Sequence, residues 1–219
     1  MAPRGALQLV TAPATEPVAY ADAQSWLRLD QTTDATLVTS LLLAARRRAE
    51  DITGRALITQ TWDYFLDAFP DADYWSLSRP LGIRPYRSEL LVPPSRQALI
   101  VPRPPLQAVT FIKYVDVAGV LQTLNPTAYT VDVATEPARI VPVFGTLWPG
   151  TQAVPNAVQV RFVAGYGAAA AAVPAEILAA IQLCTAAWYE YREAVTSENL
   201  RETPYSADAL LMPYRVELV

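Results

Sequence analysis

The chain has 219 residues, 52% of them apolar and 17% charged, so it is long enough to form one domain or two small ones around a buried core. Its 17 basic and 21 acidic residues give a net charge of −4, which argues against a basic nucleic-acid-binding surface across the fold. The sequence contains no histidine, which excludes Ser-His-Asp and Cys-His catalysis and His-ligated zinc.

A single cysteine, Cys184, cannot form an internal disulfide, so nothing in the cysteine content indicates an oxidising compartment. No apolar run approaches the roughly 20 residues needed to span a bilayer. We therefore expect neither a signal peptide nor a membrane anchor, and we expect assembly in the cytoplasm of the cell that makes the protein.

The N-terminal quarter predicts two helices after an extended arm. Residues 1–17 contain three prolines and no periodicity, which predicts the arm. Apolar residues at helical spacing predict a short helix over 18–29. A second helix is predicted over 34–53, with Thr33 as a candidate N-cap and Gly54 as the C-terminal stop.

The second predicted helix is amphipathic and carries three consecutive arginines. Its apolar arc is made of Leu37, Leu41, Ala44, Ala45 and Ile52, widened by Val38, Leu42 and Ala49. Arg46 and Arg47 fall outside this arc at i,i+4 spacing from Glu50 and Asp51, a pattern typical of a solvated face. Arg48 projects into the arc, so its head group either extends past the helix edge or meets a carboxylate in an interface.

The period then changes to that of β-strands. Alternating or β-branched runs predict about six antiparallel strands, at 58–69, 106–115, 120–124, 128–133, 139–143 and 157–164. Within this region, residues 71–105 are rich in proline and contain the aromatic residues Tyr74, Trp75 and Tyr86. We interpret this segment as an irregular surface loop or edge hairpin, with a polyproline docking motif as the alternative.

The C-terminal part predicts a long helix and a short one. The long helix begins near Pro174 and runs to about residue 195, and Cys184 lies on its packing stripe. Because this helix is apolar nearly all round, it must be covered on two sides. One cover is the domain's own core, and a neighbouring subunit is a candidate for the second. The short helix has Ser206 as its N-cap and ends at Met212. The apolar residues near it predict that this end docks on another surface.

These elements predict an α+β fold, in which a small helical bundle carries an inserted antiparallel β unit. The bundle comprises two N-terminal helices, one long C-terminal helix and a short terminal helix, over residues 18–56 and 165–219. The β-rich insertion spans 57–164.

No sequence motif for phosphate binding, metal binding or nucleophilic catalysis is present. Asp63 and Asp67 share one face of a predicted strand, and this alternation is typical of a solvated strand face rather than of a glycosidase pair. The only lysine, Lys113, is interpreted as an edge-strand charge and not as a Schiff-base residue. We therefore expect no enzymatic activity, no cofactor and no bound metal.

Several segments together resemble the head-to-tail adaptor (connector, or head-completion) family of long-tailed phages, with its prophage and gene-transfer-agent relatives. The segments, in order, are DAQSWLRL, DATLVTSLLLAARRRAEDITGRALITQTW, RPPLQAVTFIKYVD, ARIVPV, NAVQVRFVAGYG, VPAEILAAIQL and PYSADALLMPYRV. The resemblance covers most of residues 18–216. The sequence departs from the family pattern between about residues 71 and 97.

This resemblance implies a structural virion protein of the neck, at the head-tail interface. Copies of such a protein form a ring, usually dodecameric, that binds below the portal protein, extends the DNA channel and offers a platform for the stopper or tail-completion protein. Double-stranded DNA would pass through the lumen without sequence-specific binding, and an excess of acid over base suits that passage.

On this hypothesis we assign three groups of candidate contact residues. The portal contacts are Leu210, Leu211, Tyr214 and Arg215. The subunit-interface ion pairs are formed from Arg46, Arg47, Arg48, Glu190 and Glu193. The distal loop contacts are Tyr74, Trp75 and Tyr86.

Two other classes of function stay open at this point. A tail or baseplate module could bind carbohydrate or protein on an aromatic platform made of Trp62, Tyr64, Trp75 and Tyr86. An enzyme could work with Asp, Glu and Tyr alone, and it would need a strongly perturbed carboxylate in a pocket.

Overall fold

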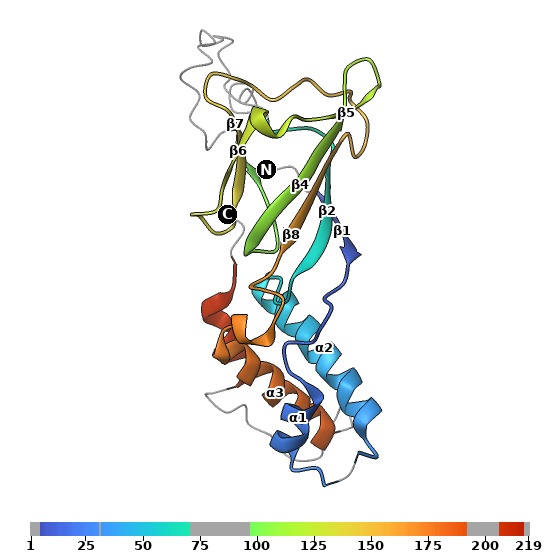
Figure 1. The fold of residues 1–219 in the computed structure, drawn as a ribbon, viewed down its shortest axis with the longest axis vertical. Coiled ribbons are helices and arrows are strands. Elements are labelled where there is room, and N and C mark those ends of the chain that lie inside the picture. The colour runs from blue at the N-terminus through green and yellow to red at the C-terminus, as the bar shows by residue number, and fades with distance from the viewer. Residues whose placement is uncertain (1–4, 31, 71–96, 192–205, 217–219) are drawn as a thin grey trace, which may run out of the picture. The chain divides into compact units, whose positions relative to one another are not determined.

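A computed structural model describes residues 5–30, 32–70, 97–191 and 206–216 of the chain. The chain forms two compact units, which we call the β unit and the helical unit (Figure 1). The β unit comprises residues 1–12 and 61–163, and the helical unit comprises 13–60 and 164–219. Within the described ranges, no helix is both long enough and apolar enough to cross a membrane.

The helical unit contains α1 (Tyr20–Leu27), α2 (Ala35–Thr53), α3 (Ala175–Glu190) and α4 (Ala207–Leu211), with short 3-10 turns at Ala170–Ala172 and Met212–Tyr214. Local signals set several of these ends. Gly54, with φ of 70°, ends α2 in the left-handed conformation, and its N–H donates to the Glu50 carbonyl. The Ser206 side chain accepts from the Ala209 N–H and so caps α4, as predicted. The N-cap of α2 is Asp34 and not Thr33, one residue later than expected.

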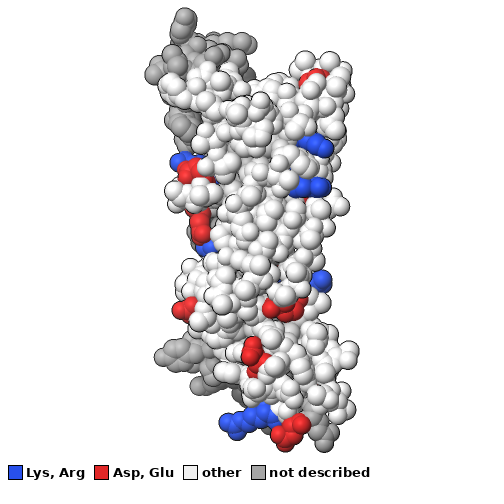
Figure 2. Space-filling model, in the orientation of Figure 1, with Lys and Arg blue, Asp and Glu red and all other residues white. Residues whose placement is uncertain are grey.

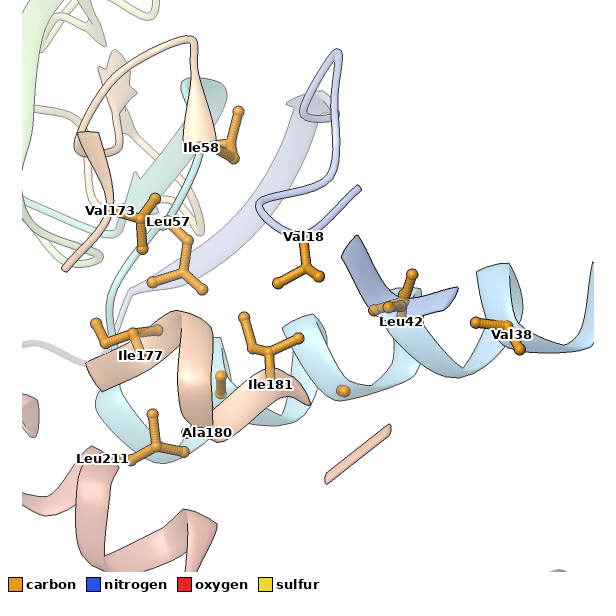
Figure 3. Packing of buried hydrophobic residues seen from close by; sticks show 13 residues of the cluster. Val18, Val38, Leu42, Leu57, Ile58, Val173, Ile177, Ala180, Ile181 and Leu211 are labelled. Atoms are coloured by element: carbon orange, nitrogen blue, oxygen red, sulfur yellow. The ribbon is translucent and has the colours of Figure 1, made fainter. Parts of the chain in front are cut away.

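The core of the helical unit lies where α2, α3 and α4 meet, together with the segment that leaves α2 (Figure 3). Its fully buried side chains include Val38 and Leu42 of α2, Leu57 and Ile58 after α2, Ile177 and Ile181 of α3, and Leu211 of α4. α3 packs against α1, α2 and α4, so three elements of its own chain cover much of this apolar helix.

The buried face of α2 differs from the predicted arc. Val38, Leu42, Ala45 and Ala49 are buried, and so are three polar residues of the same helix, Arg46, Glu50 and Thr53. Leu37 and Ala44, which were predicted to be central, are exposed. The buried side of α2 is therefore rotated about the helix axis from the predicted arc. Apolar residues lie on more than one side of this helix, so hydrophobicity alone does not show which side packs on the core.

The β unit contains a five-stranded sheet and a three-stranded sheet. In the first, the order is β1 (Ala6–Thr11), β2 (Gln60–Leu66), β8 (Val158–Ala164), β4 (Leu106–Val115) and β5 (Leu121–Thr123). In the second, it is β3 (Leu99–Ile100), β7 (Arg139–Pro142) and β6 (Tyr129–Asp132), with antiparallel pairing throughout.

The core of the β unit is built on β8, whose inward side chains alternate with outward ones in the pattern of a strand with one buried face. Val158, Val160 and Phe162 are fully buried, and so are Ile112 of β4 and Ile140 of β7. Phe69 stacks on Trp148 with 4.6 Å between ring centroids, and the Trp148 indole N–H donates to the Gln97 carbonyl at 2.7 Å.

The mixed α+β class is confirmed, and β4 has the predicted bounds. Two strands were not predicted. β1 lies in the expected extended arm, where it pairs antiparallel with β2, and β3 lies in the segment interpreted as an irregular excursion. That interpretation is wrong for Leu99 and Val101, which are both buried. Residues 71–96 of the same segment lie outside the described residues.

Candidate interaction surfaces

Arg46 lies in a buried ion cluster of the helical unit, not on a solvated face. Its Nε is 2.7 Å from Glu16 Oε2, and its Nη1 is 2.7 Å from Glu50 Oε2. Only 6% of the Arg46 side chain and 9% of the Glu50 side chain are exposed. The predicted i,i+4 pair is therefore present, but it is buried, so the prediction of a solvated face is wrong. Glu16, which precedes α1 in the chain, supplies a second carboxylate to Arg46.

The other oxygen of Glu50 serves the segment after α2. Glu50 Oε1 accepts a hydrogen bond from the Leu57 N–H at 3.1 Å and another from Gln60 Nε2 at 2.7 Å. Charges withdrawn from water need this degree of hydrogen bonding to be tolerated. The Arg46 guanidinium thus links Glu16, four residues before α1, to Glu50 of α2, and Glu50 in turn binds the segment that leaves α2. This role lies within its own chain.

Arg48 and Arg47 are the exposed members of the arginine run. Arg48 Nη2 lies 3.1 Å from Asp208 Oδ2 of α4, and both side chains are about half exposed. Arg48 therefore binds a carboxylate of its own chain while its side chain stays half exposed, so it combines features of the two predicted alternatives. An exposed pair of this kind stabilises a fold by less than about 1 kcal/mol.

The remaining predicted interface residues lie near or beyond the end of α3. Glu190 is exposed at the last position of that helix. Glu193 lies outside the described residues, and so do the predicted distal contacts Tyr74, Trp75 and Tyr86.

The C-terminal segment, defined here as residues 206–216, packs on the helical unit of its own chain. Leu211 is 1% exposed in the core, and Leu210 and Tyr214 pack partly buried against that core. The Val216 N–H donates to the Thr53 carbonyl at 2.8 Å, and Arg55 Nε donates to the Tyr214 carbonyl at 2.6 Å. The prediction that this end docks on something is answered within the chain itself.

Side chains of the C-terminal segment also interact with the start of α3. The Tyr214 hydroxyl donates to Glu176 Oε2 at 2.8 Å. The pKa of Glu176 is lowered mainly by a hydrogen bond from its own backbone N–H, and further by the hydrogen bond from the Tyr214 hydroxyl. The hydrogen bond between the two side chains also raises the pKa of Tyr214. Arg215 and Met212 are exposed, so of the four predicted portal contacts Arg215 is the one most open to a partner.

Asp63 is buried in the β unit, which overturns the prediction that it lies on a solvated strand face. Its carboxylate accepts from Arg161 Nε at 2.8 Å and Nη2 at 2.7 Å, and from Gln159 Nε2 at 2.9 Å. The Arg161 hydrogen bonds lower the pKa of Asp63 most, and burial opposes them. Asp67 is exposed and accepts from the Asn156 N–H at 2.9 Å, so the two carboxylates have separate structural partners.

The other residues considered for chemistry also have structural surroundings. Lys113 lies over the Phe111 ring at 4.7 Å, on a part of β4 that pairs with β5 and is therefore not at the sheet edge. Trp62 is half-buried with the Arg103 guanidinium 5.6 Å from its ring centroid, so one part of the supposed aromatic platform already has a neighbour. In the part of the chain that the structure describes, no group of three or more His, Cys, Asp or Glu residues could hold a metal ion.

Exposed apolar side chains on the β unit were missed by the sequence analysis. Val117 in the β4–β5 turn is 76% exposed, and Phe144 after β7 is 84% exposed. β1 has all six residues exposed, including Leu7, Leu9 and Val10. On the face drawn in Figure 2, acidic and basic side chains are scattered and form no large patch of one sign. The β unit therefore exposes these apolar side chains at a strand edge and in turns.

No family model and no curated protein matches the sequence. Solved structures do match the fold. A chain in the virion of a native gene transfer agent (GTA) particle has a TM-score of 0.72 at 24% identity, over 97% of this chain and 96% of that chain. A chain in the neck of an empty GTA particle, computed with C6 symmetry, has a TM-score of 0.72 at 25% identity, over 98% and 97%.

A third match is a chain in the neck of a native GTA particle, computed with C12 symmetry, with a TM-score of 0.66 at 24% identity over 98% of this chain and 97% of that chain. These similarities span both the helical unit and the β unit. The chain therefore has the fold of structural components found in the neck of a virion.

Proposed function

We propose that this chain is a non-enzymatic structural protein of the virion neck, and specifically a ring-forming head-to-tail adaptor. The observation that carries the proposal is the similarity of fold over 97–98% of the chain to chains of GTA virions and necks. Similarity over a whole chain with two units is more specific than similarity of one common unit.

In this role, copies of the chain form a ring, a dodecamer, below the portal protein. The C6 and C12 symmetries of the neck structures support ring assembly. The ring extends the DNA channel and presents a platform to the stopper or tail-completion protein. A net charge of −4 supports passage of DNA, since a lumen rich in arginine would bind phosphate and release counterions.

For the portal contact we propose the C-terminal segment, with Arg215 as its exposed hot-spot candidate. Leu210 and Tyr214 present only part of their surface, and Leu211 is buried in its own chain. Leu211 can touch the portal only if the segment leaves its site on the helical unit. For contacts between copies, the exposed residues Arg47 and Glu190 remain candidates from the original set, whereas Arg46 is engaged within its own chain.

The test is the mass of the purified protein, alone and mixed with the portal protein of the same particle, measured by light scattering at several salt concentrations. We expect a stoichiometric ring to form with the portal. Absence of association under all conditions would overturn the adaptor proposal.

A point variant tests the portal contact more sharply than a truncation, because truncation would also remove Leu211 from the core. We expect Arg215→Glu to weaken association with the portal and to leave the fold intact. The matched control is Arg28→Glu, an equal change of charge at an exposed position outside the proposed contact residues. Equal portal binding by the wild type and Arg215→Glu would refute the assignment of Arg215.

A further inference from the structure

One edge strand of the five-stranded sheet, β1, is largely exposed in the part of the chain that the structure describes. β1 pairs with β2 through one edge, and the described part of the chain supplies no strand for its other edge. All six residues of β1 are exposed, and Leu7, Leu9 and Val10 are about 40% exposed. An exposed apolar edge strand is a template for pairing with another strand.

The opposite side of the same sheet has a second open stretch, on β4. β5 pairs only with Lys113–Val115 of this ten-residue strand. Beyond them, the Leu124 N–H donates to the Ile112 carbonyl, and the Asp116 N–H donates to the Val120 carbonyl.

These two hydrogen bonds show that the even-numbered residues of β4 direct their backbone groups toward the side where β5 lies. Because backbone groups alternate along an antiparallel strand, those of Leu106, Ala108 and Thr110 point to the same side. No described strand lies beside them there, and Ala108 and Thr110 are exposed.

The strand directions make the two edges complementary. Asn156, just before β8, binds Asp67, just after β2, and the Val115 N–H at the end of β4 donates to the Ala157 carbonyl before β8. β2 and β4 therefore both run antiparallel to β8. Because β1 is antiparallel to β2, it runs opposite to β4 (Figure 1).

Two copies related by rotation about an axis roughly along the strands would therefore meet with β1 antiparallel to β4. Such a contact uses different surfaces of the two copies, so it is heterologous and closes into a ring when the rotation fits. The six residues of β1 match the six residues 106–111 in length. Neither stretch contains a charged residue of the kind that usually protects a free edge.

We propose that β1 of one copy adds antiparallel to the open edge of β4 of the next copy, so that the sheets of neighbouring subunits join around the ring. This inference rests on the proposed ring function and names the strands that make the subunit contact. Backbone hydrogen bonds supply the pairing, and burial of Leu7 and Leu9 supplies apolar contact area.

Disulfide trapping tests the pairing in rings formed with the portal protein. In a Cys184→Ala background, each chain carries Leu7→Cys or Leu9→Cys together with Ala108→Cys or Thr110→Cys. The sheet face of each residue follows from its contacts. Gln8 pairs with Asp63, Asp63 binds Arg161, and Arg161 lies over Phe111, so these four residues share one face. Leu7 and Leu9 alternate with Gln8 and lie on the other face. Leu7 and Leu9 therefore share a sheet face with Ala108 and Thr110, the face opposite to that of Phe111.

The matched control combines Gln8→Cys with Ala108→Cys, which would lie on opposite faces of a joined sheet. We expect at least one of the four same-face pairs to give a ladder of covalent oligomers on mild oxidation, and the control to give none. Light scattering first establishes that rings have formed.

If rings form and none of the four pairs crosslinks, the strand pairing is overturned and the adaptor function stands. If no ring forms under any condition, both proposals fail. As a second measurement, we expect Leu9→Lys to abolish ring formation while the monomer stays folded, and Val133→Lys, at an exposed site after β6, to leave rings unchanged. Normal rings from Leu9→Lys would also overturn the pairing.

Discussion

Arg46 and Glu50 lie one helical turn apart on α2 and form a buried ion pair, with 2.7 Å between Nη1 and Oε2. Removal of one partner from such a pair leaves an uncompensated charge away from water. Glu50 also accepts from the Leu57 N–H and from Gln60, so its loss leaves two further donors without that acceptor.

We expect Glu50→Ala to lower the free energy of unfolding by about 3 kcal/mol, measured by urea denaturation. Arg47→Ala, next to Arg46 on the exposed side of α2, should change it by less than about 0.5 kcal/mol. Equal effects of the two substitutions would show that the buried cluster does not contribute to stability.

Gly165 can be tested through its backbone. Its φ is 130°, and a Cβ added there would lie 2.6 Å from the backbone carbon and oxygen of Ile58. We expect Gly165→Ala to destabilise the fold by about 2–3 kcal/mol, because the conformation is strained for an L side chain. Gly150→Ala is the control, since the added Cβ would meet only Val117 at 3.4 Å. Thermal melts that shift equally for both variants would contradict this account.

Leu211 tests whether the C-terminal segment belongs to the core of its own chain. We expect Leu211→Ala to cost about 2–5 kcal/mol, the range for large-to-small changes at buried sites, in a urea titration of the isolated protein. Met212→Ala, at the exposed neighbouring position, should cost far less. A stability unchanged by Leu211→Ala would mean that the segment is not docked in solution.

Asp63 predicts a dependence of stability on acid pH. Arg161 lowers the pKa of Asp63 from its ordinary value of 3.8, so the native state binds this proton less readily than the unfolded state does. The resulting stabilisation is present above the unfolded value and is lost as pH falls through the lower pKa of the folded state.

We therefore expect wild type to exceed Asp63→Asn in stability at pH 7 and this difference to shrink below pH 4, in urea titrations at each pH. Asp67→Asn, at the exposed carboxylate just after the same strand, should remove much less of the acid-dependent stability. A difference between wild type and Asp63→Asn that stays constant from pH 7 to pH 3 would rule out the proposed contribution.

The Tyr214 hydroxyl can be followed through the titration of Glu176. We expect Tyr214→Phe to raise the pKa of Glu176, because a hydrogen bond to the ionised carboxylate is lost, while the backbone N–H still holds the pKa below its usual range. Carbon-detected NMR of the Glu176 side chain measures the change. An unchanged titration would mean that the hydroxyl does not bind this carboxylate in solution.

Features that depend on neighbouring residues were predictable from the sequence. Gly54 ends α2, Ser206 caps α4, and β4 has the predicted bounds of 106–115. Turn and cap chemistry act within a few residues, and the strand period is visible in a single run of ten. The resemblance to a neck protein also rests on short local segments of the sequence.

Features that depend on distant segments were decided only by the tertiary structure. The sequence predicted that Arg46 and Asp63 lie on solvated faces. In the structure Arg46 binds Glu16, 30 residues earlier, and Asp63 binds Arg161, 98 residues later. β1 is a strand because β2 pairs with it, at sequence separations of 50 residues or more. Periodicity reports that a face is polar or apolar, but only packing of remote segments determines which polar groups lose water and which apolar groups keep it.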